Sequence, residues 1–132
     1  MDGATGTRDE TRLAGVRARL ADLADDDPTP AELALMRRLL RSFENRAPAA
    51  ADRLVGLLHD GDPGRVREQA HSLKGSASNI GATALADLCE TVEDAARSGV
   101  VPEPATTADR VREEVAGALR AVSVVAGEYE PE

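Results

Sequence analysis

A histidine, a lysine and a glycine lie within five residues of one another in the segment 69–82, where they could together hold an anion. In a helix of about 100° per residue, His71 points away from the apolar stripe of this segment. Lys74 follows His71 at i+3 and can reach an anion on the imidazole, whereas Gly75 follows at i+4. The apolar stripe consists of Val66, Ala70, Leu73, Ala77 and Ile80.

The lysine is chemically distinctive because the chain carries 16 lysine and arginine residues, of which Lys74 is the only lysine. Arginine presents a rigid planar fork, whereas lysine presents a compact charge on a flexible stem that can follow a moving phosphoryl group. Gly75 has no side chain to crowd the imidazole. The pattern predicts an outward histidine that another protein can approach closely.

A neutral imidazole acts as a nucleophile through one nitrogen while an acceptor holds the N–H of the other. Glu93 is a candidate acceptor. His71 lies 10 residues before Gly81 and Glu93 lies 12 after it, so in an antiparallel hairpin their heights differ by about 3 Å. Glu93 also lies about 80° from the core line of its own helix, on the flank that faces a neighbour.

The run from His71 to Ser76, His-Ser-Leu-Lys-Gly-Ser, resembles the His-x-Leu-Lys-Gly signature of histidine phosphotransfer (HPt) domains. The run Asn-Ile-Gly-Ala at 79–82 and Leu85 extend this resemblance, which covers roughly residues 30–99. The first 28 residues lie outside it.

The resemblance implies a role for each site residue. His71 would be phosphorylated on Nε2, Lys74 would help to hold the phosphoryl group, Glu93 would hydrogen-bond the ring, and Gly75 would give the partner room. Two further positions on the same helix are secondary candidates: Gln69 and Ser78.

The same resemblance implies a partner, namely the receiver domain of a response regulator or of a hybrid histidine kinase. That receiver would supply the phosphoaspartate and its bound Mg²⁺. This chain has no glycine-rich nucleotide loop and is expected to be a phosphoryl carrier in a two-component phosphorelay, with no ATP site and no cofactor of its own. The alternative is a helical adaptor that binds a kinase or receiver without carrying phosphate, although the histidine and glycine are both retained.

Other chemistries fit less well. Glu68-x-x-His71 has the spacing of di-iron bundle ligands, but the second histidine, His59, has Gly56 where the second glutamate would stand. We therefore expect no metal site, and we interpret His59 as an ordinary surface residue.

A serine hydrolase site is also disfavoured, because no strand-turn-helix elbow accompanies the serines that adjoin His71. A weak, transient docking surface is expected to include Ala77, Ile80 and exposed parts of the 30–45 helix.

The composition limits the remaining functions. At 132 residues the chain forms one domain, and its net charge of −8 argues against nucleic-acid binding. Cys89 is the single cysteine and is expected to be a buried thiol in a reducing compartment. With no signal peptide and no run of 18 apolar residues, we expect a cytoplasmic monomer without membrane association. An arginine-rich, lysine-poor composition fits a high-GC bacterial source.

Apolar periodicity predicts an all-α fold, an antiparallel up-down four-helix bundle with an N-terminal accessory helix. Residues 1–6 are expected to be disordered, 7–127 to form the single HPt-like domain, and 128–132 to be a tail. Whether Pro48 kinks one helix or separates two is left open. The expected helices cover residues 7–25, 30–60 as one or two helices, 62–80 carrying His71, 82–98 as its partner, and 107–126.

Overall fold

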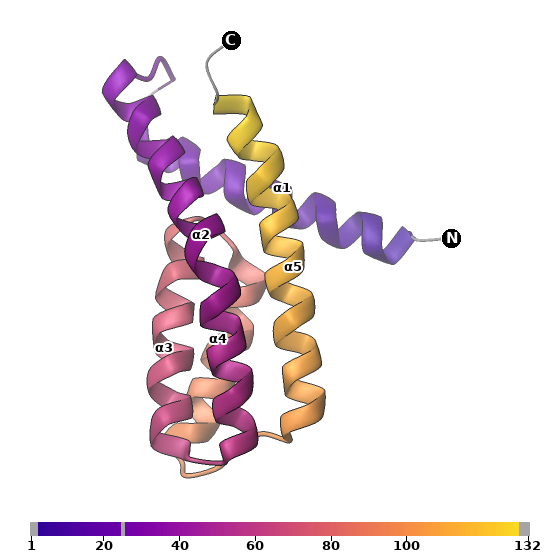
Figure 1. The fold of residues 1–132 in the computed structure, drawn as a ribbon. Helices are drawn as coiled ribbons and strands as arrows, with labels where there is room; N and C mark the ends of the chain where they lie inside the picture. Colours follow the sequence, from indigo (N-terminus) through magenta and orange to yellow (C-terminus); the bar gives the residue numbers. More distant parts are fainter. Residues whose placement is uncertain (1–2, 25, 130–132) are drawn as a thin grey trace.

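The computed structural model describes residues 3–24 and 26–129, and these residues form helices without any strand (Figure 1). Helices α2 to α5 run up and down as an antiparallel four-helix bundle, and α1 crosses the bundle near the α3–α4 turn, as Figure 1 shows. The predicted all-α bundle with an accessory helix is confirmed. The helices are α1 Gly3–Leu23, α2 Pro30–Asp60, α3 Pro63–Asn79, α4 Thr83–Arg97 and α5 Pro104–Tyr129.

Helix α2 begins as its sequence predicts. The side chain of Thr29 accepts a hydrogen bond from the Glu32 amide at 3.1 Å, and the Glu32 carboxylate accepts one from the Thr29 amide at 2.9 Å. This capping box satisfies two amides that the helix itself leaves without partners. The helix then continues through Pro48 as one element of 31 residues. Pro48 is exposed, while the flanking Ala47 and Ala51 are buried, so packing on either side of the proline supports the helix.

The turns around α3 fix its position in the bundle. Gly61 ends α2 with φ of 78°, in the left-handed region that favours glycine, and Asp62 caps α3 by accepting from the Gly64 amide at 3.0 Å. Gly81, with φ of 79°, turns the chain from α3 into α4. The observed bounds of α3 and α4 agree with the predicted 62–80 and 82–98 to within one residue at each end.

Helix α5 is longer than predicted at both ends. It begins at Pro104 rather than at residue 107, because the Glu103 carboxylate accepts from the amides of Ala105 and Thr106 and so acts as a cap. It continues to Tyr129, so the predicted tail at 128 begins too early. The carbonyl of Tyr129 accepts a hydrogen bond from Arg37 of α2.

Helix α1 also begins earlier than predicted. The structure places its first residue at Gly3, so the expected disorder of 1–6 is wrong for residues 3–6, and residues 1–2 lie outside the described part. Extending a formed helix is far easier than nucleating one. The part of α1 that packs on the bundle can therefore serve as the nucleus from which the helix extends toward the N-terminus.

A contact between two glycines, Gly15 of α1 and Gly81 of the α3–α4 turn, seats α1 on that turn. A Cβ built on Gly15 would lie 2.7 Å from the carbonyl oxygen of Gly81, and one built on Gly81 would lie 2.4 Å from the carbonyl oxygen of Gly15. The two backbones therefore approach more closely than any side chain would allow.

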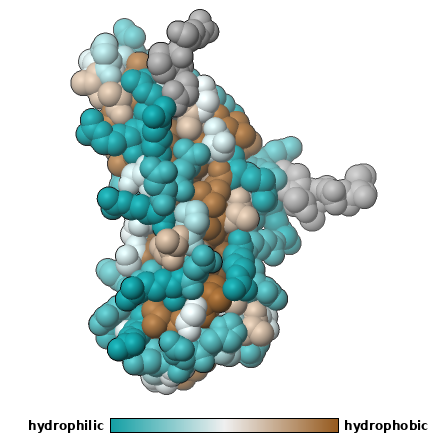
Figure 2. Space-filling model, in the orientation of Figure 1, coloured by the Kyte–Doolittle hydropathy of each residue, from teal (hydrophilic) through white to brown (hydrophobic). Residues whose placement is uncertain are grey.

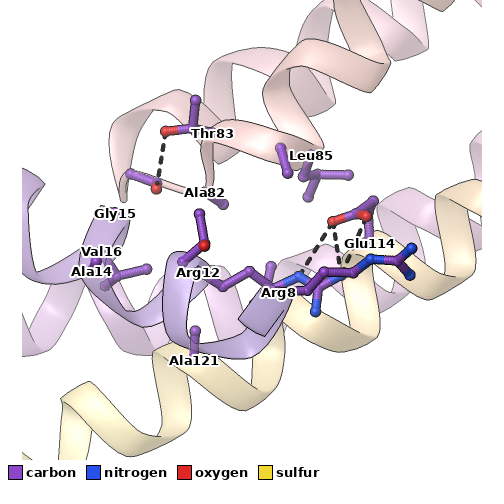
Figure 3. Close-up of a pocket in the computed structure, with 14 residues that line it drawn as sticks. Arg8, Arg12, Ala14, Gly15, Val16, Ala82, Thr83, Leu85, Glu114 and Ala121 are labelled. Atoms are coloured by element: carbon purple, nitrogen blue, oxygen red, sulfur yellow. Dashed lines mark hydrogen bonds and ion pairs between the residues drawn. The ribbon is translucent and has the colours of Figure 1, made fainter. Parts of the chain in front are cut away.

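Ion pairs hold the N-terminal half of α1 against α5. Arg12 is buried, and its guanidinium donates to both carboxylate oxygens of Glu114 at 3.2 Å and to Asp9 at 2.8 Å. Figure 3 shows the Arg12 side chain extended toward Glu114 beside a cavity of about 620 Å³. Because Arg12 is buried, its carboxylate partners compensate for lost hydration.

The core is built from leucine, valine and alanine, with Phe43 as its only buried aromatic side chain in the described residues. In the view of Figure 2, hydrophobic residues form a band between α2 and α5 that hydrophilic side chains flank. In residues 3–24 and 26–129, no helix has the combined length and hydrophobicity to cross a bilayer.

Replacing Gly15 by alanine should lower the free energy of unfolding by about 1–3 kcal/mol, because the added methyl group meets rigid backbone. Gly56→Ala is the matched control, since a Cβ at Gly56 meets nothing within 4 Å and should stabilise the helix by about 0.5–1 kcal/mol. Urea unfolding measures both variants. Equal stabilisation by the two substitutions would show that the Gly15–Gly81 contact does not constrain α1.

Candidate functional site

His71 lies on the outer side of α3 with 69% of its side chain exposed. Its Nδ1 is 2.8 Å from Oε2 of Glu93, which lies on the antiparallel helix α4. The hydrogen bond predicted from the heights of the two residues is therefore present. One edge of the imidazole is tied to the protein, while most of the ring remains accessible.

Glu93 is the buried centre of this site, with only 4% of its side chain exposed. The ammonium of Lys74 lies 2.7 Å from Oε1, and the guanidinium of Arg97 lies 3.2 Å from Oε2. One carboxylate thus contacts an imidazole and two cations. Because Lys74 and His71 share it, the ammonium is held beside the ring.

The electrostatics of the site favour an ionised carboxylate. The hydrogen bond from Lys74 holds the pKa of Glu93 below its ordinary value, against the opposing effect of burial, and the hydrogen bond with His71 adds to the lowering. The same carboxylate raises the pKa of Lys74. An ionised carboxylate can only accept, so Nδ1 of His71 carries the proton, and the lone pair of the neutral ring is on Nε2.

Gly75 and Ser78 lie on the exposed side of α3 near His71. A Cβ built on Gly75 would meet nothing within 4 Å, so the fold itself does not require glycine there. Ser78 and Gly75 line a shallow hollow together with Arg19, whose guanidinium donates to the carbonyl of Asn79 at 3.1 Å. The accessory helix α1 therefore contributes a side chain to the surface beside the histidine.

Gln69 is placed differently from the other predicted site residues. Its amide nitrogen donates to the carbonyl of Ala50 at 3.0 Å, so the side chain points to α2. Gln69 therefore links α3 to α2 and supports the helix that carries His71.

Two residues expected on the docking surface belong to the core instead. Ala77 and Ile80 are 0% and 1% exposed, so this expectation is wrong. Both lie on the apolar stripe of α3, which faces the bundle interior, and the residues that do face outward beside His71 are polar or glycine.

Sequence reasoning missed two arginines near the site. The i,i+4 spacing of Glu93 and Arg97 was a usable signal for their ion pair, because residues four apart lie on one side of a helix. The contact between Arg19 and Asn79 carried no such signal, since it depends on how α1 crosses the bundle.

Other titratable groups lie apart from this arrangement. Within the described residues, no three His, Cys, Asp or Glu side chains are grouped as metal ligands would be. Nδ1 of His59 lies 2.9 Å from the carbonyl of Val55 in its own helix. Cys89 is buried as expected, and burial raises the pKa of its thiol to about 12, which disfavours the reactive thiolate.

The lowered pKa of Glu93 predicts a pH-dependent contribution to stability. A carboxylate whose pKa is lower in the folded state stabilises the fold fully above its ordinary value of 4.5, and this contribution disappears as the pH falls through the folded pKa. The stability difference between the wild type and Glu93→Gln, measured by urea unfolding, should therefore shrink below about pH 4.5. Glu90→Gln, on the exposed surface of α4, is the control. A Glu93→Gln difference that is constant from pH 6.5 to pH 3 would contradict the assignment.

Comparisons with known proteins agree with this geometry. The chain is 27% identical to histidine-containing phosphotransfer protein B from Pseudomonas aeruginosa, whose crystal structure superimposes with a TM-score of 0.69 over 87% of this chain and 93% of that protein. No curated protein sequence gives a significant match. A model of the Hpt domain matches residues 38–121, which is more than half of the chain and includes both His71 and Glu93. The chain therefore belongs to the Hpt domain family.

Proposed function

We propose that this protein carries phosphoryl groups in a two-component phosphorelay, with His71 as the residue that is phosphorylated. The observation that carries the proposal is the hydrogen bond of 2.8 Å between Nδ1 of an exposed histidine and a buried carboxylate. That bond places the lone pair of the ring on Nε2, the nitrogen that does not contact Glu93. Membership of the Hpt family supports the same assignment.

The transfer step follows from this tautomer. The Nε2 lone pair attacks phosphorus, the bond between phosphorus and the receiver's aspartate oxygen breaks, and the aspartate leaves as a carboxylate. The proton on Nδ1 stays in place, so the phosphorylated ring carries a positive charge. The carboxylate of Glu93 stabilises that charge, and the reverse reaction follows the same path.

Lys74 has a separate role in this proposal. In the unphosphorylated protein its ammonium pairs with Oε1 of Glu93 at 2.7 Å. The flexible stem of lysine allows the ammonium to turn toward phosphoryl oxygens on Nε2, where it would offset their negative charge. Arg97 already contacts Oε2 and can keep the buried carboxylate paired during this movement.

The partner in this proposal is a receiver domain, because Hpt proteins interact with receiver domains in phosphorelays. The receiver would hold the Mg²⁺, while this chain would act without a nucleotide site or cofactor of its own. We place the chain in the cytoplasm as a monomer within the same proposal. The alternative adaptor would bind a receiver without accepting its phosphoryl group.

His71→Gln should abolish the transfer of radiolabelled phosphate from pre-phosphorylated receiver domains, because glutamine has no nucleophilic ring nitrogen. His59→Gln is the matched control and should retain labelling, since Nδ1 of His59 contacts the Val55 carbonyl of its own helix and no carboxylate of the described residues holds its ring. The label on the wild type should be acid-labile and base-stable. Labelling that survives in His71→Gln would exclude this histidine, and receiver binding without any labelling would favour the adaptor.

Gly75→Gln should reduce the transfer rate by roughly tenfold or more, about 1.4 kcal/mol, because a side chain there would obstruct the approach of the receiver to the imidazole. It should not destabilise the fold, since the position is open in α3. Gly56→Gln, at an equally open position of α2, should leave transfer unchanged. Transfer that is equal in the two variants would contradict the role of Gly75.

A further inference from the structure

A chain of shallow hollows connects the surface beside His71 to the outer side of α2. The hollow lined by Gly75, Ser76 and Asn79 shares Ser76 and Asn79 with a groove between α3 and α2. That groove in turn shares Ser42 and Arg46 with a hollow along α2. The accessible surface thus continues without a break from α3 onto α2.

Arginines concentrate along this surface. The α2 hollow is lined by Arg37, Arg38, Arg41 and Arg46, and Arg19 lines the hollow beside Gly75. We call Arg19, Arg38, Arg41 and Arg46 the arginine face. The three members on α2 are exposed. Because the chain as a whole has a net charge of −8, this concentration of positive charge is local.

The arginine face lies within reach of a protein bound at His71. The hydrogen bond from Gln69 to Ala50 shows that these two residues lie at about the same height along the bundle. Because α2 and α3 are antiparallel, Arg46 then lies at about the height of residue 73. Arg38 lies eight residues further along α2, about 12 Å away. A standard interface buries about 800 Å² on each partner and is wide enough to include His71 and the arginines of α2.

We propose that the arginine face is an electrostatic docking surface for an acidic patch on the receiver domain that exchanges its phosphoryl group with His71. The proposal rests on the proposed function. A receiver that binds Mg²⁺ beside a phosphorylatable aspartate presents carboxylates around that site. Carboxylates of this kind are repelled by most of the surface of this chain and attracted by the arginine face.

This charge arrangement orients the partner more than it strengthens the complex. Exposed ion pairs contribute little net affinity, but complementary patches raise the association rate and disfavour wrong orientations. The members of the arginine face begin beside Gly75 and end on α2, whereas Arg97, on the α4 side of His71, is already paired with Glu93 and Asp94. The receiver would therefore bind with its phosphoaspartate over the imidazole and with the carboxylates on the α2 side of that aspartate toward the arginine face.

The test compares two double variants that each remove two positive charges. Arg38→Gln/Arg46→Gln removes two of the four charges of the arginine face, and Arg110→Gln/Arg112→Gln removes the charges of two exposed arginines of α5, a helix that packs on α2 and α4. Glutamine keeps the helix propensity of arginine, so both variants should fold. Binding to purified receiver domains is measured by fluorescence anisotropy, and phosphotransfer is measured in parallel.

We expect the α2 variant to lower the association rate with the receiver by roughly tenfold at low salt, and to raise the KM for the phosphorylated receiver correspondingly, with the rate at saturating receiver unchanged. The α5 variant should change either value by less than about twofold. In about 1 M salt, where the Debye length is about 3 Å, the difference between the variants should disappear.

Equal binding and equal salt dependence in the two double variants would overturn the docking surface. If the receiver binds but His71 is never labelled, the carrier function fails, while the binding difference between the variants still decides the docking surface. If no receiver binds the wild type, both proposals fail.

Discussion

The site depends on one buried carboxylate. Glu93 lies between α3 and α4, where a lone charge would be costly, and it is acceptable only because His71, Lys74 and Arg97 surround it. The same contacts arrange the chemistry, since they fix the tautomer of the imidazole and hold a cation next to it. Stability and reactivity therefore depend on the same contacts of Glu93. The rest of the bundle keeps α3 and α4 in the register in which these contacts form.

That register is set away from the histidine. Asp62 fixes the beginning of α3, and Gly81 fixes the turn that leads into α4. The backbone contact between Gly15 and Gly81 then places α1 across this turn, and Arg12 holds α1 to α5 through Glu114. The accessory helix is thus attached to the element that determines the height of His71 relative to Glu93, although all of α1 lies outside the segment that the Hpt family model covers.

Short-range sequence signals made the helical bundle and the contact between His71 and Glu93 predictable. The features that were not predicted depend on tertiary packing or on an unrecognised helix cap. The caps at Thr29 and Asp62 are short-range signals, and counting residues from Gly81 was enough to place Glu93 level with His71. The start of α5 was misplaced because a glutamate, Glu103, acts as its cap. Contacts between residues far apart in the chain, such as that of Gly15 with Gly81, leave no pattern in a single sequence.

The arrangement is also consistent with the proposed transfer of a phosphoryl group in both directions. The free imidazole hydrogen-bonds Glu93 through Nδ1. In the proposed transfer the phosphorylated ring would present the same N–H with an added positive charge, so the carboxylate would serve both states. Lys74 is the group that can change partners, from Oε1 of Glu93 to the phosphoryl oxygens. In the proposed transfer, stabilisation of the phosphorylated state would be partly offset by loss of the ion pair between Lys74 and Glu93, which would keep the phosphoryl group transferable. Partner choice would then depend on the surface around the histidine.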